Sequence, residues 1–139
     1  MRRVVVTGLG IVSSIGNDAS EVTESLRQAK SGISFAPDIA EHGFRCQVWG
    51  KRDLDPTDLV DRRAMRFLSQ GGAWNHVAMK QALADSGLEE KDYSENERTG
   101  IIMGSGGPST RTLIEAADIT IKNGSPKRIG PFAVPKAMS

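Results

Sequence analysis

A run of β-branched residues near the N-terminus most constrains the fold of this chain. Residues Arg3-Val-Val-Val-Thr7 place branched apolar side chains next to one another, and Gly8 follows them directly. Such a run is typical of a strand that is buried on both faces, as in a sheet covered by helices. The sequence Asp18-Ala-Ser-Glu21 is a capping box that predicts a helix, for which Gly32 supplies the stop. The apolar face of this helix is expected to hold Val22, Leu26 and Ala29.

The middle of the chain predicts another strand and a long helix. Phe44, Cys46 and Val48 alternate with polar or larger residues, which indicates a half-buried strand with these three side chains facing a core. A single helix is expected from about Asp61 to Ser86, closed by Gly87. Gly71-Gly72 lies inside it, and the cost of glycine in a helix predicts close approach of another backbone there.

The last part repeats the alternation. Gly100–Met103 is a short apolar run that predicts another strand, and Gly104-Ser-Gly-Gly107 follows it. Pro108 and Ser109 then open a helix through about Ile121, with Asn123-Gly124 as its end. The order of strands and helices predicts an α/β fold. Three short strands make a thin sheet for such apolar helices, so we expect residues 1–139 to be an incomplete part of that fold.

Charge and cysteine content exclude several classes of protein. The 18 Lys and Arg against 17 Asp and Glu give a net charge of +1, so no global field attracts nucleic acid or an anionic membrane. Cys46 with His42 and His76 cannot fill a structural zinc site of four ligands. Gly8, Gly10 and the following serines interrupt the apolar start, which argues against a signal peptide, and no stretch is apolar enough to span a membrane. We expect a soluble, cytoplasmic protein without a metal.

The glycine-rich turns suggest nucleotide binding only weakly. Gly8-Leu-Gly10 follows a predicted strand but lacks the third glycine and the later acidic residue of a dinucleotide-binding fingerprint. Gly104–Gly107 could hold a phosphate on backbone N–H groups, yet it lacks the Lys-Ser/Thr pair of a P-loop. For Gly104–Gly107 a tight turn is the favoured interpretation, in which a side chain would collide with another group, such as a substrate chain.

Residues 1–139 contain no convincing catalytic centre. A reactive thiolate needs a helix N-terminus or a neighbouring cation or histidine. Cys46 is expected to point with Phe44 and Val48 toward a core, which favours an inert buried thiol. No arrangement of Ser, His and Asp, and no pair of carboxylates, has the spacing of an acid and base.

The basic side chains are more informative. Arg62, Arg63 and Arg66 lie close together at one end of the predicted long helix, where like charges repel unless an anion is bound. Lys127 and Arg128 lie in a stretch without acidic residues. A solvated charged face and an anionic protein or phosphate partner both remain open.

Four segments resemble one enzyme family in the same order. Residues Arg3–Gly16 resemble the N-terminus of the β-ketoacyl-acyl carrier protein synthases, and Ser13-Ser14-Ile15 is closer to the type I than to the type II bacterial enzymes. The resemblance continues in Asp61–Phe67, Gly100–Gly107 and Gly130–Met138, and so spans the whole chain.

The resemblance implies a thiolase-type fold, with a mixed sheet between helical layers, of which residues 1–139 are the N-terminal segment. It implies a homodimer that elongates acyl-carrier protein with malonyl-carrier protein by decarboxylative Claisen condensation. The family's Cys-His-His site would lie beyond Ser139, so this segment alone is predicted to be inactive. No cofactor is implied except the phosphopantetheine arm of the carrier protein.

Particular positions also match the family. Arg62, Arg63, Arg66, Lys127 and Arg128 match positions that hold the acidic acyl carrier protein, although Gly124 replaces a basic residue of the family's second patch. Gly107 matches a small residue beside the acyl pocket, and Met138 matches one that reaches the partner subunit's pocket. The alternatives are a non-catalytic module that binds an acidic carrier protein and a nicotinamide-dependent reductase.

Overall fold

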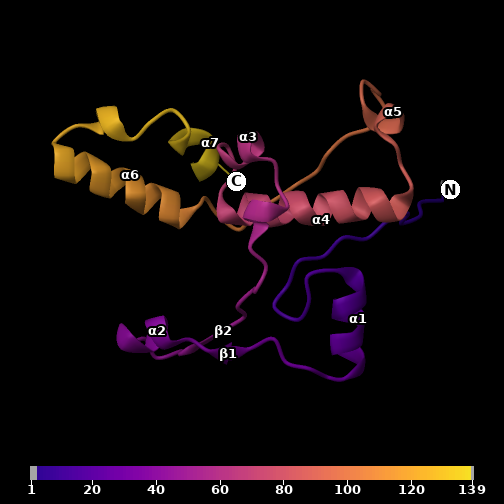
Figure 1. Cartoon of the computed structure of the whole chain (residues 1–139), viewed down its shortest axis with the longest axis horizontal. Coiled ribbons are helices and arrows are strands. Elements are labelled where there is room, and N and C mark those ends of the chain that lie inside the picture. Colours follow the sequence, from indigo (N-terminus) through magenta and orange to yellow (C-terminus); the bar gives the residue numbers. More distant parts are fainter. Residues whose placement is uncertain (1–2, 139) are drawn as a thin grey trace. The chain divides into compact units, whose positions relative to one another are not determined.

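The computed structural model describes residues 3–138, whose helices and strands are labelled in Figure 1. These residues divide into two compact units. Unit 1 comprises residues 3–55 and 78–88, and unit 2 comprises residues 56–77 and 89–138. In chain order the elements are α1 (Ala19–Arg27), β1 (Ser34–Phe35), α2 (Pro37–Glu41), β2 (Val48–Trp49), η1 (Pro56–Asp58), α3 (Arg62–Met65), α4 (Gln70–Ser86), α5 (Glu90–Tyr93), α6 (Thr110–Asn123), η2 (Pro126–Arg128) and α7 (Ala133–Ala137).

The first helix of unit 1, α1, begins where the capping box predicts and ends earlier than expected. The Asp18 carboxylate accepts a hydrogen bond from the N–H of Glu21 at 2.8 Å, which satisfies a free donor of the first turn. At the other end, Ala29 adopts a left-handed φ of 51°, and the N–H of Lys30 donates to the Ser25 carbonyl at 2.8 Å. This is a Schellman motif, so Ala29, and not Gly32, ends the helix.

The buried face of α1 also differs from the prediction. Val22 and Ser25 are the buried residues of α1, whereas Leu26 is 66% exposed. The Ser25 hydroxyl donates to the Ile15 carbonyl at 2.6 Å. A hydroxyl that satisfies a backbone acceptor can therefore occupy a buried position that the apolar pattern assigns to leucine.

The sheet of unit 1 is smaller than expected. β1 and β2 pair antiparallel, with Ser34 opposite Trp49 and Phe35 opposite Val48. Only the end of the predicted 44–49 strand forms it, and its partner strand was not predicted. Phe44 and Val48 are 62% and 50% exposed, so the expectation that they face a core is wrong for the described residues.

In unit 1 an N-terminal segment crosses the last turns of α4 at very close range. An added Cβ on Gly8 would collide with the Ala82 carbonyl oxygen, and one on Gly10 would collide with the Ala78 carbonyl oxygen. Polar contacts hold this crossing. The Asp85 carboxylate accepts from the N–H of Leu9 at 2.8 Å, and the Gln81 side chain accepts from that of Ile11 at 2.9 Å.

Gly71-Gly72 does not mark such an approach. An added Cβ on Gly71 would have only the Ser69 Oγ atom at 4.0 Å, and one on Gly72 would meet side chains at 3.4 Å or beyond. Within residues 3–138, the prediction of a backbone approach at these glycines is wrong.

The predicted long helix is two helices. Asp61 caps α3, since its carboxylate accepts from the N–H of Arg63 at 2.8 Å. The N–H of Phe67 then bonds to the Ala64 carbonyl at 2.9 Å, which closes a tighter turn. The Ser69 hydroxyl accepts from the N–H of Gly72 at 3.1 Å and starts α4 as a new cap. The glycines therefore occupy the first turn of α4.

The later part of unit 2 is built around α6. The Ser109 hydroxyl accepts from the N–H of Thr112 at 3.4 Å, and Gly124 ends the helix with a left-handed φ of 60°, both as predicted. α6 packs against η2 and α7. In the described part of the chain, the buried apolar side chains of unit 2 are Pro56, Val60, Ala73 and Val77.

The predicted strands at residues 3–7 and 100–103 are absent among the described residues. Val4 is 92% exposed and Ile102 is 100% exposed. A strand requires a hydrogen-bonding neighbour, and no described segment pairs with either run. Among residues 3–138, no helix has the length and apolar character needed to cross a membrane.

Candidate functional site

Three exposed cations of unit 2 lie on α3 and at its C-cap. Arg62, Arg63 and Arg66 are all exposed, and within residues 3–138 none of them forms an ion pair with a carboxylate. The carboxylate of the N-cap Asp61 accepts hydrogen bonds from backbone N–H groups of the first turn of α3. These guanidinium groups therefore remain available to an anionic partner. We call Arg62, Arg63 and Arg66 the first basic group.

The second basic group, Lys127 and Arg128, lies on η2. The Ser125 hydroxyl accepts from the N–H of Lys127 at 3.3 Å, and the N–H of Ile129 donates to the Pro126 carbonyl at 3.0 Å. Both cations are exposed. Gly124 turns the chain from α6 into this short helix, so that η2 packs back against α6.

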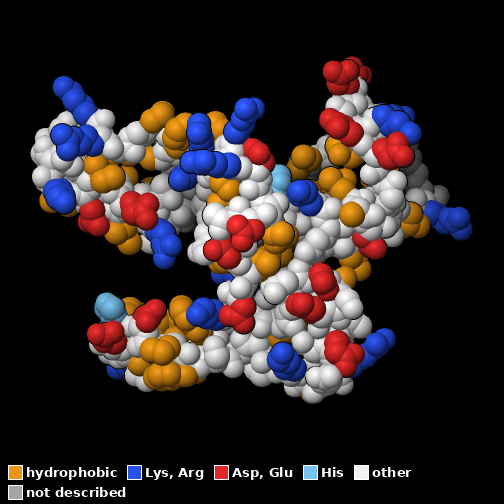
Figure 2. Space-filling view, viewed as in Figure 1, with side chains coloured by type: hydrophobic (Ala, Val, Ile, Leu, Met, Phe, Trp, Pro, Cys, Tyr) orange, Lys and Arg blue, Asp and Glu red, His pale blue; other side chains and the backbone are white. Residues whose placement is uncertain are grey.

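The structure keeps the two basic groups apart on unit 2. Figure 2 shows blue side chains over the α3 and α7 region and a separate set over the end of α6 and η2. A molecule that contacts both groups must therefore span the surface between them.

Gly107 and Met138, which are expected beside an acyl pocket, are exposed in the structure. An added Cβ on Gly107 would meet nothing within 4 Å in the described part of the chain, so the predicted collision at Gly107 is wrong for these residues. Met138 is 69% exposed and follows α7.

Cys46 is exposed, and its thiol points to the Val48 carbonyl, with Sγ and O 3.7 Å apart. Among the described residues the expectation of a buried thiol is therefore wrong, and no described segment covers this part of the chain, since Val48 is also 50% exposed although it pairs with Phe35.

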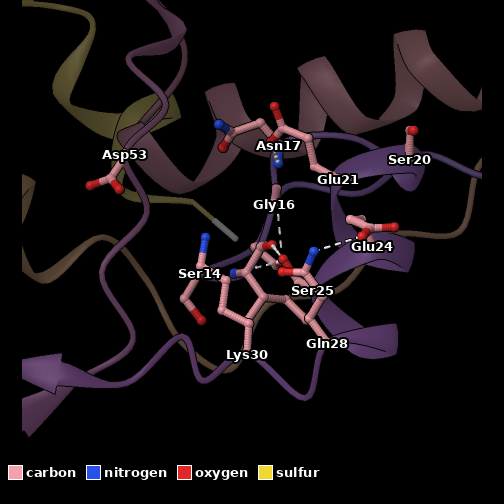
Figure 3. Close-up of a pocket in the computed structure, with 12 residues that line it drawn as sticks. Ser14, Gly16, Asn17, Ser20, Glu21, Glu24, Ser25, Gln28, Lys30 and Asp53 are labelled. Carbon is pink, nitrogen blue, oxygen red and sulfur yellow. Dashed lines mark hydrogen bonds between the residues drawn. The ribbon is translucent and has the colours of Figure 1, made fainter.

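Unit 1 contains a polar cleft of about 490 Å³ that the sequence patterns did not indicate (Figure 3). Its lining groups largely satisfy one another. Gln28 donates to the Glu24 carboxylate at 2.7 Å, and the Glu21 carboxylate accepts from the N–H of Asn17 at 2.8 Å. The lining residues are Ser13, Ser14, Ile15, Gly16, Asn17, Ser20, Glu21, Glu24, Ser25, Gln28, Lys30 and Asp53.

Unit 2 has a smaller hollow, of about 210 Å³, between α6 and α7. Thr112 and Glu115 line it from α6, and Phe132 and Lys136 line it from the α7 side. The Phe132 ring also contacts Phe67 edge to face, with centroids 5.2 Å apart and an interplanar angle of 89°. Sequence reasoning missed this contact, because no local signal pairs two aromatic rings so far apart in the chain.

The class of protein follows from comparison with known families. The model described as "Beta-ketoacyl synthase, N-terminal domain" matches residues 1–139. The chain therefore belongs to the β-ketoacyl synthase family, as the four ordered segments predicted.

Particular relatives are named as acyl-carrier-protein enzymes. The chain is 46% identical over its full length to 3-oxoacyl-[acyl-carrier-protein] synthase 1 of Escherichia coli K12 and covers 34% of that protein. It is 41% identical, with the same coverage, to the protein of that name in Haemophilus influenzae. Against synthase 2 of Coxiella burnetii it is 33% identical over 99% of this chain. The chain thus spans about a third of the length of these relatives.

Solved structures confirm the fold. A β-ketoacyl synthase from Burkholderia phymatum superposes with a TM-score of 0.82 at 22% identity, over 99% of this chain and 34% of that one. The ishigamide ketosynthase/chain length factor has a TM-score of 0.76 at 24% identity and 96% coverage of this chain. Residues 1–139 are therefore part of a thiolase-type α/β fold, although the sheet within the described residues has only two strands.

Proposed function

We propose that residues 1–139 are the N-terminal part of a fatty acid condensing enzyme that elongates acyl-carrier protein with malonyl-carrier protein. The observation that carries this is the 46% identity over the whole chain to a protein named 3-oxoacyl-[acyl-carrier-protein] synthase 1. The family model supports the same conclusion, because it matches the chain from end to end.

In the proposed reaction a cysteine thiolate attacks the acyl thioester, and the carrier's phosphopantetheine leaves as a thiolate that takes up a proton from solvent. Malonyl-carrier protein then loses CO₂, and the resulting carbanion attacks the enzyme-bound thioester. The new carbon–carbon bond forms as the cysteine thiolate departs. The cysteine and two histidines belong to the proposed part of the protein beyond residue 139, so residues 1–139 supply recognition and support, and alone are inactive.

The carrier protein is proposed to dock on the two basic groups. Arg62, Arg63 and Arg66 are exposed and have no carboxylate partner within the described residues. Because the net charge is only +1, the chain as a whole does not attract an acidic protein, and any attraction must come from such local basic surfaces. The proposal includes no metal or organic cofactor other than the carrier's phosphopantetheine arm.

Gly107 and Met138 are proposed to lie beside the acyl pocket and at a subunit contact of a homodimer. Both are accessible in unit 2, with Met138 69% exposed and open space around Gly107 among the described residues. An added side chain at Gly107 would then be limited by the acyl chain or by a part of the protein outside residues 3–138.

Charge reversal of the first basic group tests the function. In the full-length protein, Arg62→Glu, Arg63→Glu and Arg66→Glu together should lower kcat/KM for carrier-bound substrates by about ten- to a hundredfold, since three attractions become repulsions. Turnover of small thioester substrates should change far less. The single variant Arg98→Glu, at an exposed cation in the loop after α5 of the same unit, is the control for a charge reversal away from the first basic group and should be compared with Arg66→Glu alone.

Equal losses with both kinds of substrate would contradict carrier docking at α3. Absence of any condensing activity in the unmodified full-length protein would contradict the enzymatic proposal.

The same basic surface also suits a second function, a non-catalytic module that binds an acidic carrier protein. Under this alternative the full-length protein binds carrier protein, loses binding on charge reversal of α3 and shows no condensation. A nicotinamide titration separates both from a reductase, which alone would bind that cofactor.

A further inference from the structure

The two basic groups lie on elements that the Phe67–Phe132 contact joins. Phe67 follows the first basic group directly, and its N–H donates to the Ala64 carbonyl at 2.9 Å, so its backbone is held against the last turn of α3. The ring meets Phe132 at 5.2 Å and 89°. Edge-to-face geometry of this kind is an attractive arrangement of aromatic quadrupoles.

Phe132 in turn belongs to the body that carries the second basic group. The N–H of Lys136 donates to the Phe132 carbonyl at 3.1 Å, which makes Phe132 the start of α7. α6 packs against both α7 and η2, and η2 holds Lys127 and Arg128. The aromatic contact therefore links α3 to the α6–η2–α7 body within unit 2.

Neither ring is buried as a core residue. Phe67 is 51% exposed and Phe132 is 36% exposed. Loss of one ring therefore removes a surface link and leaves the buried side chains of unit 2 in place.

We infer that Phe67 and Phe132 are positioning residues that fix the spacing of the two basic groups, so that one acidic carrier protein contacts both at once. This rests on the proposed function, because the ligand is the carrier protein. When the link is absent, α3 samples other positions, and only the fraction with the correct spacing binds at both groups.

The test uses the full-length protein and follows KM for carrier-bound substrate. Phe67→Leu and Phe132→Leu should each raise this KM by about three- to tenfold, the range expected for loss of one aromatic pair. KM for a small thioester and kcat should stay close to those of the unmodified protein. Phe132→Tyr, which keeps the ring, should restore the low KM.

Combined variants distinguish spacing from a general structural effect. The variant Lys127→Ala with Arg128→Ala should raise the KM in the unmodified background and much less in the Phe67→Leu background. Phe67→Leu with Phe132→Leu should resemble either single variant. Phe44→Leu, which removes an exposed ring in unit 1, serves as the control and should change nothing.

Equal changes for carrier-bound and small substrates, or fully additive variants, would overturn the inference. Its failure is separable from failure of the proposed function. If charge reversal on α3 selectively impairs carrier-bound substrate while the Phe variants do not, only the inference is wrong. If charge reversal also has no selective effect, carrier docking itself is wrong.

Discussion

At Gly8 and Gly10, backbone atoms of α4 in unit 1 leave no space for a side chain. An added Cβ on Gly10 would lie 2.7 Å from the Ala82 backbone nitrogen and would collide with the Ala78 carbonyl oxygen. Backbone atoms of a helix cannot move aside as a flexible side chain can. The neighbouring N–H groups of Leu9 and Ile11 are fixed to α4 side chains, which prevents the segment from lifting away.

Gly10→Ala should therefore destabilise the protein by about 2–4 kcal/mol, as expected for strong overpacking. Gly71→Ala is the matched control, because Gly71 is exposed near the start of α4 and a Cβ there has open space. That change should stabilise by roughly 0.5–1 kcal/mol through helix propensity. Denaturant unfolding of the full-length variants measures both, and equal effects of the two changes would contradict the crossing.

At the scale of the elements, α3 depends strongly on its N-cap because it has 4 residues. The Asp61 carboxylate accepts from the N–H groups of Arg63 and Ala64, at 2.8 and 3.4 Å. A helix of this length has almost no interior hydrogen bonds to hold it. The cap therefore sets the conformation of the segment that carries the first basic group.

Two substitutions at Asp61 separate its capping role from its charge. Asp61→Asn preserves the capping acceptor and removes a negative charge beside the arginines, so affinity for the carrier protein should be kept or increased. Asp61→Ala loses the cap, which costs about 1 kcal/mol of local stability, and should weaken carrier binding. Titration of the full-length variants with carrier protein measures this, and weaker binding by Asp61→Asn than by Asp61→Ala would contradict the assignment.

At the scale of the whole molecule, many large apolar side chains are exposed in the described part of the chain, and two consecutive runs stand out among them. Val4, Val5 and Val6 are 92%, 75% and 80% exposed, and Ile101 and Ile102 are 75% and 100% exposed. Runs of this kind mark interaction surfaces. The relatives are about three times as long as this chain, and we propose that these runs pair with the corresponding remainder.

The 139-residue chain expressed by itself should therefore bind an apolar-surface dye strongly and should not condense carrier-bound substrates. The full-length protein should bind much less dye per molecule, because both runs are then covered. Val5→Lys should reduce dye binding of the short chain, with Thr23→Lys on exposed α1 as the control. Equal dye binding by the short and full-length proteins would contradict this.

Helix ends and family membership were determined by the sequence itself. Asp18, Asp61, Ser109 and Gly124 mark helix boundaries in the structure as predicted, because a cap depends on backbone groups within a few residues. Ordered segments likewise identified the family without any tertiary information.

Contacts between residues far apart in the chain were decided only by the tertiary structure. It placed the close crossing at Gly8 and Gly10 and not at Gly71-Gly72, left the runs at 3–7 and 100–103 unpaired among the described residues, and joined Phe67 to Phe132. Each of these depends on a partner remote in the chain. Strand pairing and ring contacts have no local signal, since their free energy comes from a neighbour that the local sequence does not specify.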